Sequence, residues 1–183
     1  MASFTDRMLG AARLDVRTYE EVEADKTATT QAMLVVVGAG LATAIGSSAT
    51  EGIRDLVVST VFSLVGWYVW AFVTFAVGTR LFPEPQTRAN VGELLRTTGF
   101  SAAPGLLRVF GIVPLLGTLV FVITLFWMLA SFIVAVRQAL DYESTGRAIV
   151  VCVIGWLFFV AFSLAAWFFR GAAWFFRGIL AMF

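Results

Sequence analysis

The sequence predicts an all-α fold: a polytopic membrane bundle of about five transmembrane helices with an N-terminal amphipathic helix and an interfacial C-terminal tail. Hydrophobic residues make up 60% of the 183 residues and charged residues 14%, against about 45–50% and about 25% in soluble domains. Four long runs contain no charged residue, and the charges cluster between them. A bilayer accommodates so much apolar surface because lipid replaces water around it.

The first element, residues 1–27, is predicted to be a cytosolic or interfacial segment. Apolar side chains recur every three or four residues between Phe4 and Tyr19, which indicates an amphipathic helix. Two placements stay open for it: on the membrane surface, or packed on the end of the bundle. The acidic run in YEEVEAD that follows is typical of a solvated helix face, and a binding site for a basic partner is the alternative.

The charge-free runs predict four membrane spans, near residues 28–49, 56–79, 115–136 and 148–169. About 20 apolar residues, each rising about 1.5 Å, cross a hydrocarbon core about 30 Å thick. Helix is the expected state because an unpaired backbone group is costly in lipid.

A fifth, weaker span is predicted near residues 97–113, where Pro104 should bend the helix and Arg108 should reach the headgroups. A re-entrant segment is the alternative. With five spans in a bundle over residues 28–169, nine of the 13 Lys and Arg residues share the N-terminal side. The excess predicts a cytoplasmic N-terminus and a C-terminus on the opposite side of the membrane.

The tail, residues 170–183, continues a repeat that reads AWFFRGA and then AWFFRGI. Its seven-residue period places the same side chains on one helical face. Aromatic and arginine side chains together are typical of the headgroup region, so the predicted interfacial anchors are Trp167, Arg170, Trp174 and Arg177.

No enzymatic chemistry is predicted. The chain has no His and a single Cys, Cys152, so the usual acid–base, nucleophilic and metal-binding sets are missing. We therefore expect no catalytic residue, no cofactor and no metal. A net charge of +1 predicts no nucleic-acid partner.

Small residues predict close helix packing. Gly38, Ala42 and Gly46 follow one another at four-residue steps on the first span. Such a face allows another helix to approach closely. In the short span, Gly99, Pro104 and Gly105 allow a bend and a second close approach. The partner helix could belong to the same chain, to a homo-oligomer or to a larger membrane complex.

Polar residues around the predicted cytosolic loops form a candidate docking surface. We expect Glu93 to pair with Arg96, three residues on. The alternative is that these groups merely terminate helices. The candidate residues are Arg96, Arg137, Gln138, Asp141, Tyr142, Glu143 and Arg147.

Three stretches, YEEVEAD at 19–25, RTTGFSAAPGLL at 96–107 and VRQALDYESTGRA at 136–148, together resemble bacterial members of the Yip-one domain family, the Ypt/Rab-interacting-protein-like membrane proteins. The resemblance implies a compact five-helix bundle with a cytosolic N-terminus and without catalytic residues, located in a bacterial cytoplasmic (inner) membrane. Eukaryotic relatives are associated with Rab-type GTPases and with vesicle traffic or membrane shaping.

Three functions stay open after this comparison. The first is a non-catalytic membrane scaffold or adaptor that acts through helix packing and its cytosolic face. The second is an accessory subunit of a larger membrane complex, and the third is a small channel or transporter. The threonines inside the spans, which a pore would need, are expected to bond to carbonyls of their own helices.

Overall fold

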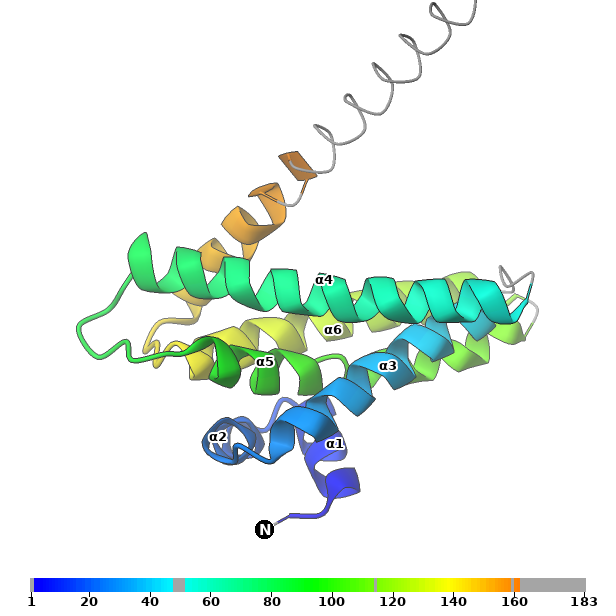
Figure 1. Cartoon of the computed structure of the whole chain (residues 1–183), viewed down its shortest axis with the longest axis horizontal. Coiled ribbons are helices and arrows are strands. Elements are labelled where there is room, and N and C mark those ends of the chain that lie inside the picture. Colours follow the sequence, from blue (N-terminus) through cyan, green and yellow to red (C-terminus); the bar gives the residue numbers. More distant parts are fainter. Residues whose placement is uncertain (1, 48–51, 114, 159, 162–183) are drawn as a thin grey trace, which may run out of the picture.

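The computed structural model describes residues 2–47, 52–113, 115–158 and 160–161 (Figure 1). These residues form helices and contain no strand, as the predicted all-α class requires. A further helix, Thr145–Phe158, follows the last labelled element. The labelled elements are α1 (Phe4–Ala12), α2 (Val16–Ala24), α3 (Ala28–Gly46), α4 (Ile53–Arg80), α5 (Val91–Phe100), the 3₁₀ helix η1 (Ala103–Ile112) and α6 (Gly117–Ala139).

The long axis of the molecule is set by α4 and α6, and α3 crosses beside them at an angle (Figure 1). The segment formed by α5 and η1 runs along α3 in the same direction. A Cβ added to Gly99 would lie 2.7 Å from the Cβ of Ala32, near the start of α3. A Cβ added to Gly46, at the end of α3, would lie 1.8 Å from the carbonyl oxygen of Arg108.

The N-terminal segment forms two helices, so the prediction of a single amphipathic helix is wrong. Leu14 between them has φ 63°, in the left-handed region, which ends α1. Asp15 then accepts a hydrogen bond from the Arg17 amide at 3.1 Å and starts α2. A period of three to four residues continues across such a turn, so the pattern alone did not reveal the break.

The short span is also two helices instead of one bent helix. It begins earlier than predicted, at Val91, where Asn90 and Glu93 form a capping box. α5 then ends at Phe100, because Pro104 has no N–H to donate to the carbonyl four residues back. The following residues continue as a 3₁₀ helix with Pro104 in its first turn.

Three of the described helices are long and apolar enough to cross a membrane, fewer than the predicted five. They are Ala28–Gly46, Leu56–Arg80 and Gly117–Ala139. The split at Pro104 leaves α5 and η1 with 10 residues each. The helix Thr145–Phe158 is apolar but belongs to the 10–17-residue class, and the rest of the predicted span 148–169 lies largely outside the described residues.

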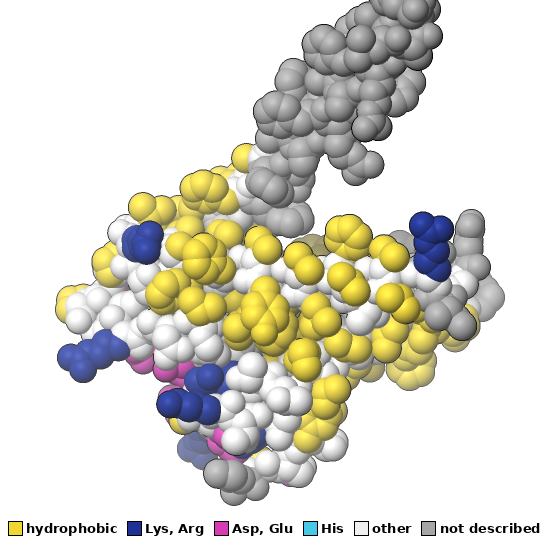
Figure 2. Space-filling view, viewed as in Figure 1, with side chains coloured by type: hydrophobic (Ala, Val, Ile, Leu, Met, Phe, Trp, Pro, Cys, Tyr) yellow, Lys and Arg dark blue, Asp and Glu magenta, His cyan; other side chains and the backbone are white. Residues whose placement is uncertain are grey.

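Large apolar side chains cover the outside of the bundle along its length (Figure 2). On α4, Phe62 is 73% exposed and Phe72 59%, and on α6 Phe126 is 66% exposed. Water-soluble proteins rarely expose a continuous apolar surface of this extent. The outer surface of α4 and α6 is therefore suited to lipid.

We predict that Gly46→Ala destabilises the protein by about 1–3 kcal/mol, because the added methyl must push η1 away from α3. Thermal unfolding in mild detergent measures the change. The matched control is Gly66→Ala on α4, where an added Cβ has no heavy atom within 4 Å. The control should be neutral or stabilising by up to about 1 kcal/mol. Equal effects of both changes would contradict the close contact between α3 and η1.

Candidate docking site at the polar end of the bundle

Charged side chains gather at one end of the molecule, around α1 and α2 (Figure 2). The loop after α4 and the turn after α6 lie at this same end (Figure 1). The elements are joined by hydrogen bonds between residues far apart in the sequence, and we call this region the polar end.

α1 and α2 are packed against the bundle. The hydroxyl of Tyr19 lies 2.6 Å from Oγ of Ser131 on α6, and Trp127 of α6 donates to the carbonyl of Ala12 at 2.6 Å. Tyr19 is fully buried, and burial raises the pKa of its hydroxyl, so it stays protonated. Of the two placements considered for this segment, the structure has the one packed on the bundle.

Arg7 connects α1, α2 and α3 from a buried position. Its side chain is only 2% exposed, and Nη2 lies 2.8 Å from a carboxylate oxygen of both Glu21 and Asp25. Its Nη1 donates to Gln31 on α3 at 3.0 Å. Hydrogen bonds from Thr27, and then from Arg7, lower the pKa of Asp25 to about 2. Two acids of the acidic run, Glu21 and Asp25, therefore form ion pairs within the protein.

Arg96 holds the end of α2, and its predicted pair with Glu93 is wrong. Its Nε donates to the carbonyls of Val22 and Glu23, both at 3.0 Å, and its Nη2 also contacts the Glu23 carbonyl. Carbonyls at a helix C-terminus carry partial negative charge and lack intrahelical donors. Glu93 is instead occupied in the cap of α5, where it accepts from Asn90.

The turn after α6 is fixed by Asp141 and Tyr142. Asp141 has φ 54°, a left-handed conformation that aspartate adopts more readily than most residues. The Tyr142 hydroxyl lies 2.9 Å from the carbonyl oxygen of Gly78 and 2.8 Å from that of Phe82. The tyrosine ring therefore points toward the end of α4.

The loop after α4 closes on this turn. Glu84, whose side chain is 8% exposed, accepts from the amide of Glu143 at 3.0 Å and pairs with Arg147 Nε at 3.2 Å. The side chain of Asp141 accepts from the amide of Arg88 at 3.2 Å. These contacts hold the start of the helix Thr145–Phe158 against the end of α4.

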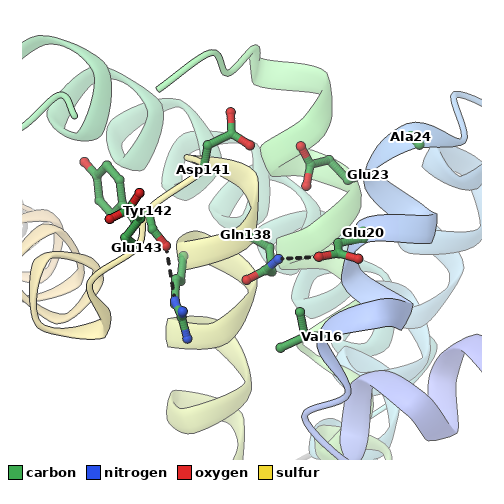
Figure 3. Close-up of a pocket in the computed structure, with 9 residues that line it drawn as sticks. Val16, Glu20, Glu23, Ala24, Gln138, Asp141, Tyr142 and Glu143 are labelled. Carbon is green, nitrogen blue, oxygen red and sulfur yellow. Dashed lines mark hydrogen bonds between the residues drawn. The ribbon is translucent and has the colours of Figure 1, made fainter. Parts of the chain in front are cut away.

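A cavity of about 520 Å³ opens between α2 and the end of α6 (Figure 3). Four carboxylates and one guanidinium line it, so its charge is strongly negative, and we call it the acidic cavity. Gln138 bridges its two walls by donating to Glu20 at 3.3 Å. Its lining residues are Val16, Glu20, Glu23, Ala24, Arg137, Gln138, Asp141, Tyr142 and Glu143.

Glu23 is the most perturbed carboxyl of this cavity. Burial, followed by repulsion from Asp141 and Glu93, raises its pKa from 4.5 to about 7, although Arg96 opposes the shift. No described group donates a hydrogen bond to its carboxylate. At neutral pH the residue therefore exchanges a proton readily, and a cation in the cavity would favour its charged form.

The predicted docking residues divide into two groups. Arg137, Gln138, Asp141, Tyr142 and Glu143 line the acidic cavity. Arg96 and Arg147 do not line this cavity. Arg96 donates to the carbonyl of Glu23 at the end of α2, and Arg147 pairs with Glu84 in the loop after α4. The sequence did not predict that α2 forms one wall of the acidic cavity, although two glutamates of its acidic run, Glu20 and Glu23, line that cavity.

The residues predicted for helix packing lie along the contact of α3 with α5 and η1. A Cβ added to Gly38 would lie 2.9 Å from the Leu106 side chain, and a Cβ added to Gly105 would lie 3.1 Å from the Cβ of Ala39. Ala42 and Pro104 are buried. The partner of this face is thus within the same chain. The predicted anchors Trp167, Arg170, Trp174 and Arg177 lie outside the described residues.

Four threonines of the predicted spans donate to carbonyls of their own helices, as expected. The donor-to-acceptor distances are 2.8 Å for Thr43, 2.7 Å for Thr60, 2.8 Å for Thr74 and 2.8 Å for Thr124. Within the described part of the chain, no group of three or more His, Cys, Asp or Glu side chains is placed to hold a metal ion.

The long apolar helices with exposed apolar surfaces define an integral membrane protein with a polar end. A family model of the Yip1 domain matches residues 15–175, and the chain belongs to this family. The resemblance drawn from the sequence is thereby confirmed. No curated protein and no solved structure matches the chain.

Glu23 predicts a dependence of stability on pH. Because its pKa is about 7 in the folded protein and ordinarily 4.5, the folded state is favoured at low pH, and this advantage is lost as the pH rises through 7. Glu23→Gln should therefore raise the melting temperature at pH 8 by about 2–4 °C and leave it unchanged near pH 4.5.

Thermal unfolding in detergent at both pH values tests this expectation. The matched control is Glu143→Gln, which removes an exposed charge from the same cavity and should preserve the dependence on pH. A wild-type melting temperature with the same pH profile as Glu23→Gln would refute the shifted pKa.

Proposed function

We propose that this protein is a non-catalytic membrane scaffold or adaptor that docks a cytosolic partner in the acidic cavity. The observation that carries this proposal is the convergence of α2 and the end of α6 on one open cavity lined by four carboxylates. Hydrogen bonds from Tyr19 and Arg96 fix α2 in place, so little order is lost on binding. A partner with a basic segment complements this charge.

The proposed orientation places the polar end in the cytoplasm of a bacterial inner membrane, with five crossings and the C-terminus outside. Three crossings are α3, α4 and α6. The fourth is α5 with η1, because 10 α-helical and 10 3₁₀ residues rise about 15 Å and about 20 Å, enough for a core about 30 Å thick. The fifth begins with the helix Thr145–Phe158.

An accessory-subunit role is the alternative, and the exposed apolar surface of α4 is the surface that would contact a larger complex. A channel or transporter has less support, because the threonine hydroxyls donate to helix carbonyls.

The orientation predicts a pattern of labelling from the two sides of the membrane. In a Cys152→Ala background, Ala2→Cys and Ser144→Cys at the polar end should react with an impermeant thiol reagent from the cytoplasmic side. Val113→Cys, 42% exposed after η1, should react from the other side. Labelling of all three positions from one side would show that α5 and η1 re-enter instead of crossing.

The docking proposal predicts a specific cross-link in intact cells. A photoreactive residue in place of Ala24, which is exposed and lines the acidic cavity, should form a discrete protein adduct. The adduct should fall about tenfold in the Glu20→Lys variant, because one charge contact of about 1.4 kcal/mol becomes a repulsion. A photoreactive residue in place of Phe62, on the apolar face of α4, is the matched control. Adducts insensitive to the charge reversal, or equal from both positions, would rule out docking in this cavity.

A further inference from the structure

A second cavity, of about 430 Å³, lies at the opposite end of the bundle from the acidic cavity. It is formed where α3 and η1 end and α6 begins. We call it the arginine cavity, because Arg108 is the one charged residue among those that line it. Its lining residues are Thr43, Gly46, Ser47, Arg108, Gly111, Gly117, Thr118, Val120 and Phe121.

The Arg108 side chain is held in place by neutral groups. Its Nε donates to Oγ1 of Thr124 at 3.0 Å, and Nη1 lies 3.5 Å from Oγ1 of Thr43. The guanidinium carbon lies 4.8 Å from the centre of the Phe121 ring. These contacts orient the guanidinium, but none of them supplies a negative charge.

The charge of Arg108 has no counter-ion among the described residues. None of their carboxylates lies within 4.0 Å of it, and an arginine side chain stays protonated in proteins. A cation close to hydrocarbon is costly unless it is paired. The remaining N–H groups of Arg108 have no described partner. No buried side-chain N or O atom of the described residues lacks a hydrogen bond, so these N–H groups are accessible, and Arg108 lines the cavity.

The walls of the cavity suit a phosphate group. Gly46 and Gly111 bring the α3 and η1 backbones together, since a Cβ on either would lie within 3 Å of the other segment. Ser47 and Thr118 also line the cavity. The Ser47 hydroxyl donates to the carbonyl of Ala44 at 3.0 Å, which leaves Thr118 as the hydroxyl donor for a ligand. A guanidinium fork with a nearby hydroxyl donor is a general arrangement for binding phosphate oxygens.

Exposed apolar side chains adjoin the cavity lining along the chain, and we call them the apolar rim. Phe121 lines the cavity and is 48% exposed, and Leu115 and Leu116, directly before the lining residue Gly117, are 99% and 41% exposed. A free anion gains no favourable contact from apolar side chains, whereas the acyl chains of a lipid would pack against them. Zwitterionic lipids bring their own cation, so the unpaired guanidinium favours a lipid with net negative charge.

We propose that the arginine cavity binds an anionic phospholipid, with its phosphodiester on Arg108 and its acyl chains against the apolar rim. The lipid would neutralise the charge of Arg108, which has no counter-ion among the described residues, and would fill the gap between α3, η1 and α6. The proposal requires the bundle to lie in a bilayer and is independent of partner docking at the acidic cavity.

Native mass spectrometry of the purified full chain in mild detergent tests the proposal with phosphatidylglycerol and phosphatidylcholine of the same acyl chains. The wild-type protein should retain phosphatidylglycerol about tenfold more strongly, and Arg108→Gln should lose this preference. The matched control is Arg54→Gln, an exposed arginine on α4 outside the cavity lining, which should keep it. A wild-type protein without preference, or an unchanged preference in Arg108→Gln, would overturn the proposal.

A second variant separates binding from folding. Thr118→Phe leaves Arg108 in place but fills the cavity from an exposed position, so it should reduce phosphatidylglycerol retention without lowering the melting temperature. If Arg108→Gln does not fold, retention of the lipid by Thr118→Phe would overturn the proposal by itself. The last measurement adds inorganic phosphate at millimolar concentration to the protein with bound phosphatidylglycerol. Displacement of the lipid by phosphate would identify a free-phosphate site and refute the lipid assignment.

Discussion

The close approach of α3 to α5 and η1 is the contact on which the rest of the fold depends. In a bilayer, lipid tails are as apolar as the side chains, so helices associate through dispersion, which requires backbones to come near. Gly46, Gly99 and Gly105 provide this access at three levels of one interface. α6 then packs on η1 and α4 on α3, so the positions of both ends of the bundle follow from this interface.

Buried arginines organise the polar end once the interface is formed. Arg7 joins α1 to the acidic side chains of α2, and Arg96 binds the carbonyls at the end of α2. Both guanidiniums are almost completely buried, and removing either would leave its partners unsatisfied. With those acids and carbonyls occupied, Glu20 and Glu23 remain to face the end of α6, which is how an acidic run becomes one wall of a cavity.

The two ends of the bundle have opposite chemistry. At the polar end, four carboxylates surround a cavity that opens beside the charged helices α1 and α2. At the other end, one arginine lies among hydroxyls, glycines and exposed apolar side chains. The first arrangement suits a basic protein segment from water, and the second suits an anionic lipid from the bilayer. A single chain can therefore be held by lipid at one end while it presents a docking surface at the other.

Hydrophobicity and local order along the chain are sufficient to predict the all-α class, the long apolar helices and most of the α6 wall of the cavity. Pro104 predicts a disruption at the right place, but the sequence pattern predicts one bent helix where the chain forms two, α5 and η1. That α2 forms the second wall, and that Arg96 binds the carbonyl of Glu23 instead of the side chain of Glu93, follows only from the folded arrangement, because Arg96 and Glu23 are 73 residues apart in the chain. Charge patterns show which groups need partners, and geometry in three dimensions selects those partners.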